Sequence, residues 1–322
     1  MKAVELQYKS GEDSIIEVMT PTAIDTEVLV KVKYSAIDTG TNQVVQKTLN
    51  PGYFVHKWTT PLILGWHYSG TIEAVGPKAK NLQVGDEVWG FLQYEPSQTQ
   101  GTFAEYVTVK EEDCARIPEG VDLKELTAAS TECLTALQAI RDLGGLSENK
   151  SILVLGAGGG VGSAAVQIAK QLGARVTAVC SSKDVERVKD FGADVVLDRT
   201  TQSDKIFSKD TKYDVIFDTP SKYSPWRSFQ YLNSRGVFVV TLPSMGLLGA
   251  MVLSVFNGKK AAFVECHSKR QDLELVGGWL SNGSLKIDVD STYAVKDIRK
   301  ALERQGNKAK VGRVVIQVEG GW

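Results

Sequence analysis

The sequence predicts an α/β protein of two domains, one mostly β and one built on a doubly wound parallel sheet. Three observations predict this class. The chain has 322 residues, more than a single core ordinarily serves. Up to about residue 120, short β-branched runs such as "EVLVKVKY" alternate with turn signals. From residue 151, continuous apolar runs alternate with amphipathic helical patterns, which is typical of a parallel sheet covered on both faces.

Short strands dominate the first part of the chain. We expect them at "EVLVKVKY" (27–34), "GTIEAVG" (70–76), "GDEVWGF" (85–91) and "TFAEYVTV" (102–109). Near the end of the chain, glycines mark the ends of two helices, and "GRVVIQV" is a final strand. We expect this terminal segment to pack on the first part. The mostly-β domain then comprises 1–120 and 268–322, with the α/β domain, 121–267, inserted between them.

The α/β part follows a regular order of strand and helix. Its expected strands are "SILVLGA", "ARVTAVC", "ADVVLD", "YDVIFDTP", "GVFVVTLP" and "AAFVEC". The most apolar stretch, "MGLLGAMVLSVF" (245–256), is shorter than the roughly 20 apolar residues that cross a bilayer. We therefore expect a core or interface helix there and no membrane span.

Charge and cysteine usage exclude several classes of partner. The net charge of −1 offers no basic surface for nucleic acid and no polybasic face for anionic lipid. Cys114, Cys133, Cys180 and Cys266 are scattered without a CxxC pair, which favours free thiols in a reducing compartment. Cys133 reads as a small buried apolar residue. The start of the chain has no signal-peptide pattern, and we expect a cytoplasmic protein.

A glycine-rich turn follows the first strand of the α/β part. "ILVLGAGGGVGSAAVQIAK" passes from an apolar strand to a helix, the context that a dinucleotide-binding fingerprint requires. In frame it reads A-x-G-x-x-G, formed by Ala157, Gly158, Gly159, Gly160, Val161 and Gly162. Gly159 would let the backbone approach a pyrophosphate, and Gly162 would let the helix pack closely on the strand. The pyrophosphate would rest on the N–H groups of the helix N-terminus.

The residues after the second strand indicate which nicotinamide cofactor binds. A carboxylate about 20 residues past the motif would accept hydrogen bonds from the ribose of NAD. Here the strand ends at Cys180 and is followed by Ser181, Ser182 and Lys183, with Arg199 after the third strand. Hydroxyls and cations suit a 2′-phosphate, so we expect NADPH.

Ligands of such sheets bind outside the carboxyl ends of the strands. The fifth strand ends in "VTLP", and we therefore expect Thr241 and Leu242 to line the nicotinamide site.

Seven ordered segments resemble the medium-chain dehydrogenase/reductase superfamily, in its zinc-free quinone oxidoreductase and enoyl reductase branch. They are "PLILGWHYSGTIEAVG", "VGDEVWGF", "GTFAEYVTV", "ASTECLTALQAI", "GAGGGVGSAAVQIAKQLGA", "DFGADVVLD" and "VGRVVIQV". The resemblance implies a GroES-like mostly-β catalytic domain joined to a Rossmann NADP(H)-binding domain, and a homodimer formed through the Rossmann domain.

The sequence departs from its zinc-dependent relatives where they bind the metal. Where those enzymes carry a GHE motif, this chain reads Gly65-Trp66-His67. His56, His67 and His267 lie far apart, with no cysteine or carboxylate at ligand spacing. We interpret them as packing or surface histidines and expect no metal site. The branch's usual GxD segment reads Trp66-His67 at its last two positions, and its NPxD segment corresponds to "YSAIDTGTNQV" (34–44).

The resemblance implies hydride transfer to an electron-poor small molecule: a quinone, an enone, a 2-alkenal or an enoyl thioester. Tyr53 stands where relatives carry a pocket tyrosine, or is a loop aromatic over the cleft. Asp38 and Thr41 would face the nicotinamide, or form a local Asx-type turn; Tyr68 is a further candidate donor. The altered "IDTGT" segment leaves open a zinc-independent dehydrogenase of a bulky alcohol. A non-catalytic NADPH-binding protein is the third alternative.

Overall fold

A computed structural model of the chain describes residues 1–6, 13–41, 61, 63–93, 100–208, 210–307 and 309–322. These residues form two compact units. The first unit joins Met1–Thr131 to Ser268–Gly283 and Ile287–Trp322, and the second comprises Glu132–His267 with Ser284–Lys286. The second unit therefore starts inside helix α3 (Leu123–Leu137), whereas the sequence pattern placed the domain boundary near residue 121.

A seven-stranded sheet forms the frame of the first unit, with strand order β14-β15-β3-β4-β5-β7 and β6 paired to β3. A separate two-stranded sheet holds β1 and β2. The strands are β1 (Lys2–Glu5), β2 (Ser14–Glu17), β3 (Glu27–Ile37), β4 (His67–Val75), β5 (Glu87–Phe91), β6 (Tyr106–Lys110), β7 (Cys114–Arg116), β14 (Val289–Ala294) and β15 (Arg313–Gln317).

Strand β3 is the longest strand of this sheet and carries the candidate residue Asp38 at its end. Val28, Val30 and Val32 are buried while the residues between them are partly exposed, which is the period of two that places one face of a strand on a core. At the end of the strand every residue from 35 to 37 is buried. Asp38 consequently leaves the sheet in a buried environment.

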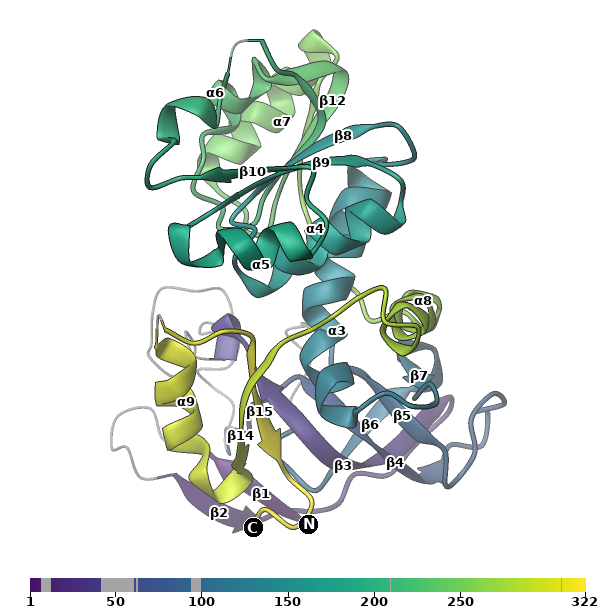
Figure 1. Ribbon diagram of the computed structural model, residues 1–322. Coiled ribbons are helices and arrows are strands. Elements are labelled where there is room, and N and C mark those ends of the chain that lie inside the picture. The colour runs from purple at the N-terminus through teal and green to yellow at the C-terminus, as the bar shows by residue number, and fades with distance from the viewer. Residues whose placement is uncertain (7–12, 42–60, 62, 94–99, 209, 308) are drawn as a thin grey trace. The chain divides into compact units, whose positions relative to one another are not determined.

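The C-terminal segment completes the first unit. Strand β15 pairs antiparallel with β3, aligning Val314 with Ile37, and helix α9 (Ile298–Gly306) packs against β14 and β15 (Figure 1). Helix α8 (Arg270–Ser281) packs on β7. Within this unit, the end of the chain thus packs on strands from its beginning.

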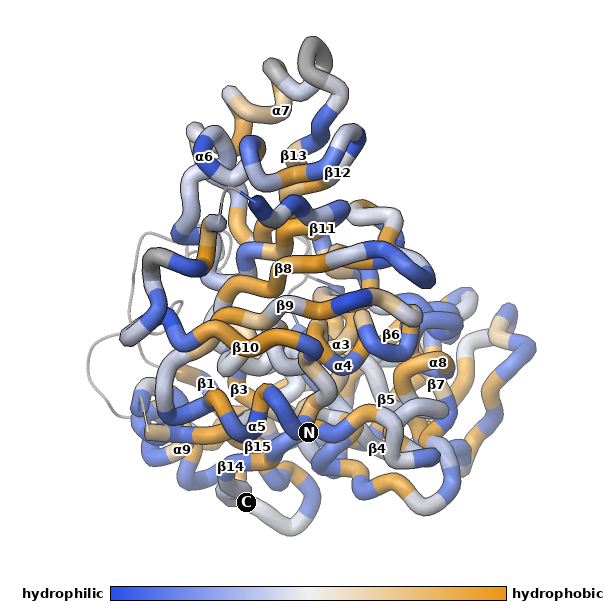
Figure 2. The backbone as a smooth tube through the Cα atoms, turned by 45° about the horizontal axis from the view of Figure 1, so that its top comes forward, coloured by the Kyte–Doolittle hydropathy of each residue, from blue (hydrophilic) through white to orange (hydrophobic). Residues whose placement is uncertain are grey.

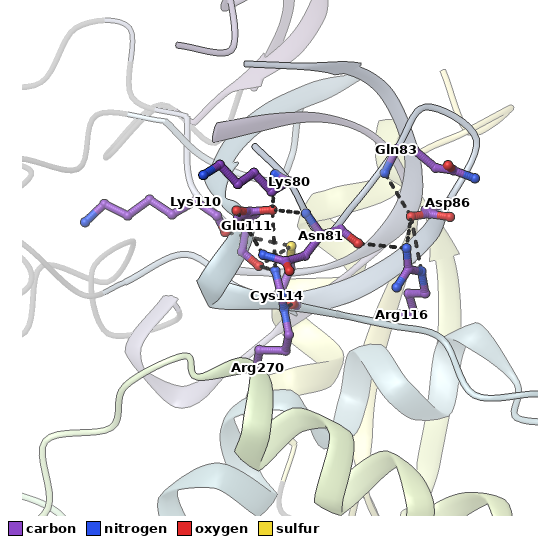
Figure 3. Close-up of polar contacts among 9 residues, drawn as sticks. All are labelled: Lys80, Asn81, Gln83, Asp86, Lys110, Glu111, Cys114, Arg116 and Arg270. Carbon is purple, nitrogen blue, oxygen red and sulfur yellow. Dashed lines mark hydrogen bonds and ion pairs between the residues drawn. The ribbon is translucent and has the colours of Figure 1, made fainter. Parts of the chain in front are cut away.

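A cluster of polar contacts fastens α8 to the turn η1 (Glu111–Asp113) (Figure 3). The Glu111 carboxylate accepts hydrogen bonds from the N–H groups of Lys80 at 3.1 Å and Asn81 at 2.9 Å. Arg270 donates to the backbone oxygens of Glu111 and, at 3.2 Å, of Cys114. Burial would raise the pKa of Glu111, but the hydrogen bonds from Asn81 and Lys80 lower it. The carboxylate therefore stays ionised and holds the 80–81 turn against η1.

The second unit contains a six-stranded, entirely parallel sheet of order β10-β9-β8-β11-β12-β13. Counted along the chain this is 3-2-1-4-5-6, the order of a doubly wound dinucleotide-binding sheet, with its switch point between β8 and β11. The strands are β8 (Ser151–Leu155), β9 (Arg175–Cys180), β10 (Val195–Asp198), β11 (Tyr213–Asp218), β12 (Leu232–Val240) and β13 (Lys260–Phe263). The expected mostly-β and doubly wound α/β combination is confirmed.

Helices cover both faces of this sheet (Figure 1). Helices α4 and α5 lie on one face and α6 and α7 on the other, as right-handed crossovers on either side of the switch point require. The α-helices are α4 (Gly160–Gln171), α5 (Val185–Asp190), α6 (Pro225–Phe229) and α7 (Met245–Asn257), with single turns η3 (Ser182–Asp184) and η4 (Ser203–Lys205) and a π-helical turn η2 (Gln138–Leu143).

The central strands of the second unit are strongly apolar, as Figure 2 shows for β8. Residues 152–155 of β8 are completely buried, whereas the edge strand β10 is only partly covered. A strand covered on both faces has no polar side, which is why its sequence is continuously apolar. Helices on both faces thus fix β8, and with it the turn that follows β8.

Candidate functional site

The glycine-rich turn forms a tight link between β8 and α4. Gly156 adopts a left-handed backbone with φ +81°, a conformation that favours glycine. The N–H groups of Gly156 and Ala157 donate to the carbonyl of Val179 on β9, at 3.0 and 2.8 Å. Gly159 caps the helix in an extended conformation, and α4 begins at Gly160. The strand–turn–helix context expected for residues 157–162 is therefore present.

Gly162 and Gly156 let neighbouring atoms approach the turn closely, whereas Gly159 leaves the surface of the turn open. A Cβ on Gly162 would lie 2.2 Å from the carbonyl oxygen of Gly156, so only glycine lets α4 pack this closely on the turn. A Cβ on Gly156 would lie 2.6 Å from Thr219 Oγ1, at the end of β11. A Cβ on Gly159 would meet only the Gly156 oxygen, at 3.5 Å. The backbone at Gly159 is thus the accessible part of the turn, and the turn fits a pyrophosphate group.

Two carboxylates flank this turn, and neither was among the residues singled out from the sequence. A Cβ on Gly158 would lie 2.5 Å from Asp184 Oδ2, and one on Gly160 would lie 1.9 Å from Glu132 Oε1. Asp184 accepts a hydrogen bond from Ser181 at 2.7 Å and forms an ion pair with Arg187 at 3.1 Å. Sequence spacing gave no signal for Glu132, because it approaches the turn from helix α3.

The residues after β9 lie at the carboxyl edge of the sheet as expected, but the hydroxyls of Ser181 and Ser182 both already donate to carboxylates. The Ser182 hydroxyl donates to Asp198 Oδ2 at 2.6 Å, and Lys183 and Arg199 are exposed. Hydrogen bonds from Ser182 and Thr200 lower the pKa of Asp198 to about 2. This edge of the sheet therefore combines exposed cations with one firmly ionised carboxylate.

The ends of β11 and β12 are tied together beside the glycine-rich turn. Thr241 Oγ1 donates to the carbonyl of Thr219 at 2.8 Å, and the N–H groups of Thr241 and Leu242 donate to Ser221 Oγ at 3.1 and 2.9 Å. Leu242 is largely exposed. The structure thus brings Thr241 and Leu242 to the switch-point edge of the sheet, next to the loop that follows β11.

In the first unit, Asp38 and Thr41 form the local turn that was one of the two sequence interpretations. Asp38 Oδ1 accepts from both the N–H (2.6 Å) and the hydroxyl (2.7 Å) of Thr41. Asp38 Oδ2 faces His67 Nε2 at 3.4 Å, and His67 Nδ1 lies 2.9 Å from Ser130 Oγ. His67 is fully buried.

The fully buried His67 is therefore part of a polar network. Arg313 extends the network by donating to Thr131 Oγ1 and to the carbonyl of Ile37, each at 3.3 Å. Burial alone would raise the pKa of Asp38, but the hydrogen bond and charge of His67, the charge of Arg313 and the Thr41 N–H hold it well below its usual range. The sequence interpretation of His67 as a packing or surface residue missed this partnership, and the adjacency of Asp38 and Thr41 gave no hint of it.

The remaining candidates divide between buried and undescribed positions. Tyr53 and His56 lie outside the described residues. Tyr68 is fully buried, and burial raises its pKa well above the ordinary value, so it does not reach the surface as a donor. Cys133 is fully buried, in agreement with its interpretation as a small apolar residue.

The described residues contain neither a metal-binding cluster nor a membrane-spanning helix. No group of three or more His, Cys, Asp or Glu side chains among them is arranged to hold a metal ion. None of the helices in the described parts of the chain has the length and apolar character that crossing a membrane needs.

Comparison with known protein families identifies the class to which this fold and turn belong. Residues 24–119 match the alcohol dehydrogenase GroES-like domain, and residues 160–261 match the zinc-binding dehydrogenase family. NAD(P)H oxidoreductase RTN4IP1, mitochondrial, from Homo sapiens is 30% identical over 273 residues, covering 81% of this chain and 68% of that protein. The chain belongs to the medium-chain dehydrogenase/reductase superfamily of NAD(P)-dependent oxidoreductases.

Further similarities place the chain within that superfamily. A quinone-oxidoreductase homolog, chloroplastic, from Spinacia oleracea is 29% identical, with 96% of both chains covered. The trans-enoyl reductase pgmF from Aspergillus terreus is 28% identical over 82% of this chain and 79% of that one. The Mus musculus RTN4IP1 protein matches locally, at 41% over 44% of this chain and 36% of that protein.

The structure of the quinone oxidoreductase from Coxiella burnetii shares the fold, with a TM-score of 0.86, 21% identity and 99% of both chains covered. The chain thus falls in the quinone oxidoreductase and enoyl reductase-like branch.

Proposed function

We propose that this protein is an NADPH-dependent, zinc-independent reductase of quinones or of C=C bonds conjugated to a carbonyl, such as enones, 2-alkenals and enoyl thioesters. The observation that carries the proposal is the open glycine-rich turn at the switch point of the second unit, between β8 and α4. The spinach and Aspergillus relatives, a quinone-oxidoreductase homolog and a trans-enoyl reductase, support the substrate class.

The chain's own groups support binding of a dinucleotide. The backbone from Gly159 to Gly162 would receive the pyrophosphate at the start of α4. When bound, the nicotinamide supplies a hydride to the electron-poor carbon of the substrate. Thr241 and Leu242 at the end of β12 would contact the nicotinamide end.

The preference for NADPH over NADH rests on the exposed cations Lys183 and Arg199, which suit a 2′-phosphate. Ser182 would act indirectly, because its hydroxyl already donates to Asp198. The Asp198 carboxylate beside it opposes a second anion. We propose that the two cations outweigh this single carboxylate.

For the reacting substrate we propose roles for Tyr53, Asp38 and Thr41. Reduction of a conjugated alkene or quinone places negative charge on oxygen, and hydrogen-bond donors stabilise that charge. The Tyr53 hydroxyl can donate to it. Asp38 accepts two hydrogen bonds from Thr41 and faces His67, so we assign Asp38 and Thr41 to holding the end of β3 and the 39–41 turn in place.

The assembly and compartment of the protein are further proposals. We propose a homodimer formed through the second unit, whose sheet ends at β13 with a single neighbouring strand among the described residues. We propose a cytoplasmic location, supported by four free cysteines, three of them buried. Subcellular fractionation tests it, with the mitochondrion and chloroplast named for the relatives as the competing outcomes.

The decisive experiment follows oxidation of NADPH, and separately of NADH, in the presence of 1,2-naphthoquinone, a 2-alkenal or a saturated ketone. We expect turnover of the first two with NADPH preferred, and none of the ketone. Turnover of the ketone, or of its alcohol in reverse, favours a dehydrogenase of a bulky alcohol. Binding of NADPH without any turnover favours a non-catalytic binding protein, and absence of binding contradicts the proposal altogether.

A further inference from the structure

A serine with a strained backbone lies at the switch-point edge of the sheet in the second unit. Ser221, in the loop after β11, has a φ of +52°, in the left-handed region that residues other than glycine rarely adopt. Such strain persists only where surrounding contacts hold the residue, and it is concentrated at functional sites. The contacts of Ser221 therefore indicate what its conformation serves.

The Ser221 hydroxyl joins this loop to the end of β12 and uses its full hydrogen-bonding capacity. Its oxygen accepts from the N–H groups of Thr241 at 3.1 Å and Leu242 at 2.9 Å. Thr241 Oγ1 lies 3.0 Å from the same oxygen and gives its own proton to the carbonyl of Thr219, at 2.8 Å. The Ser221 proton is therefore the one that can bridge to Thr241 Oγ1, so both lone pairs and the proton of this hydroxyl are used.

The loop is anchored on both sides of Ser221. Thr219 Oγ1 donates to the carbonyl of Leu155, the last residue of β8, at 2.9 Å. The Ser221 N–H donates to the carbonyl of Asp218 at 3.2 Å, and Asp218 Oδ2 accepts from the N–H of Tyr223 at 2.7 Å. These contacts connect the carboxyl ends of β8, β11 and β12, which is the edge where a doubly wound sheet binds its ligand.

We propose that Ser221 is a positioning residue for the nicotinamide half of the cofactor, because its hydroxyl fixes Thr241 and Leu242 where that half binds. The inference rests on the proposed function and adds to it a residue that acts through the end of β12. In the proposed function the pyrophosphate rests instead on the backbone at the start of α4. Loss of the Ser221 hydroxyl therefore weakens binding of the nicotinamide half and spares the other half.

The test compares two ligands by titration calorimetry: NADPH and ADP-ribose 2′-phosphate, which is NADPH without its nicotinamide. We expect Ser221→Ala to raise the Kd of NADPH about tenfold, equivalent to about 1.4 kcal/mol, and to leave the Kd of ADP-ribose 2′-phosphate unchanged. Ser221→Gly should have the same effect, because glycine adopts the left-handed conformation without strain but also lacks the hydroxyl.

The matched control is Asn149→Ala. Asn149 also has a left-handed backbone, with φ +67°, and its side chain is exposed. It lies just before β8 begins at Ser151, at the opposite edge of the sheet from Ser221. This substitution should change neither Kd.

A second readout needs no cofactor. Amide hydrogen exchange of Thr241 and Leu242, followed by NMR, should become about tenfold faster in Ser221→Ala, because their N–H groups lose their acceptor. Amides in the middle of β8 should keep their protection, which verifies that the variant is folded.

The outcomes separate the inference from the function on which it rests. An equal loss for both ligands in Ser221→Ala, or no loss for NADPH, overturns the positioning role while the natural protein still binds its cofactor. A loss in Ser221→Ala that is absent in Ser221→Gly also overturns it, because the backbone conformation and not the hydroxyl is then responsible. Unchanged exchange of the two amides contradicts the hydroxyl link itself. If the natural protein binds neither ligand, the proposed function fails, and this inference fails with it.

Discussion

The hydrogen-bond partners of the His67 ring limit which of its two nitrogens can carry a proton. Ser130 has one hydroxyl proton, and its oxygen lies 3.1 Å from the carbonyl of Thr127 and 2.9 Å from His67 Nδ1. If that proton goes to Thr127, His67 donates from Nδ1; if it goes to His67, the ring's own proton is on Nε2. In the second case Nε2 carries the proton and lies 3.4 Å from Asp38 Oδ2.

At this scale we predict that His67 and Asp38 are energetically coupled. His67→Asn removes the partner of a buried carboxylate, and such changes cost about 3–5 kcal/mol of the free energy of unfolding. The double variant with Asp38→Asn should lose less than the sum of the two single variants, by about 1–3 kcal/mol. Denaturant unfolding of all four proteins at pH 7 measures the coupling.

A suitable control for this cycle is His267→Asn, because the His267 side chain is exposed. It should shift the unfolding midpoint little. Strict additivity of the Asp38 and His67 substitutions would show that the 3.4 Å approach of Nε2 to Oδ2 contributes no coupling energy.

Among single residues, the sequence indicated those whose roles are local. The glycines of the glycine-rich turn lie within a few residues of one another, and so do Asp38 and Thr41. Sequence spacing alone therefore predicts the contacts within each of these two turns. The partner of His67, by contrast, is Ser130, 63 residues further along the chain. The side chain that lies against Gly160 is Glu132, which comes from another helix. No pattern within a short window reports such distances.

At the scale of elements, the carboxyl ends of β8 and β11 meet at the switch point. Asp218 aligns with Leu155 across these strands, and its side chain is fully buried. Its Oδ2 accepts from the N–H of Tyr223 at 2.7 Å, while its Oδ1 has no hydrogen-bond partner among the described residues. Burial raises the pKa of Asp218 to about 6, although backbone N–H groups from 221 to 223 act in the opposite direction.

We predict that Asp218 makes stability fall as pH rises from about 4 to 6. The unfolded carboxyl loses its proton near its ordinary pKa of 3.8, whereas the folded one keeps it until about 6, so the folded state binds more protons in this window. The raised pKa corresponds to a loss of about 3 kcal/mol across the window, fully reached above pH 6.

Urea unfolding at a series of pH values measures this loss. Asp218→Asn should flatten the profile between pH 4 and 6, whereas Asp210→Asn, at an exposed position, should leave it as in the natural protein. An identical pH profile for Asp218→Asn would contradict the buried, protonatable carboxyl.

At the scale of the whole molecule, the second unit exposes apolar side chains beside β13, the edge strand of its sheet among the described residues. Met245, Leu248 and Val252 of α7 are 83%, 56% and 60% exposed and share one face of the helix, which packs on the edge strand β13. An unpaired strand edge next to an apolar helix face is suited to pairing with a second copy of itself about a two-fold axis. The sequence left a core helix and an interface helix open at 245–256, and the exposure of these side chains favours the second.

We therefore predict that the 35.1 kDa chain runs at twice that mass in size-exclusion chromatography with light scattering. Leu248→Lys combined with Val252→Lys should shift it to the monomer, because two charges would be buried in the interface. Met19→Lys, at a 92% exposed position of the first unit, should not. A natural protein that is monomeric at high concentration would rule out the dimer.

The sequence by itself determined the fold class, the strand–turn–helix of residues 151–171 and the family, because periodicity, glycine spacing and ordered segments are properties of neighbouring residues. Only the tertiary structure decided that His67 faces Asp38, that Asp218 is buried with one oxygen unpartnered among the described residues, and that Glu132 lies over Gly160. These contacts join separate strands and helices, and their chemistry depends on burial. Burial arises only when distant segments pack together and exclude water, which is why no local pattern reports it.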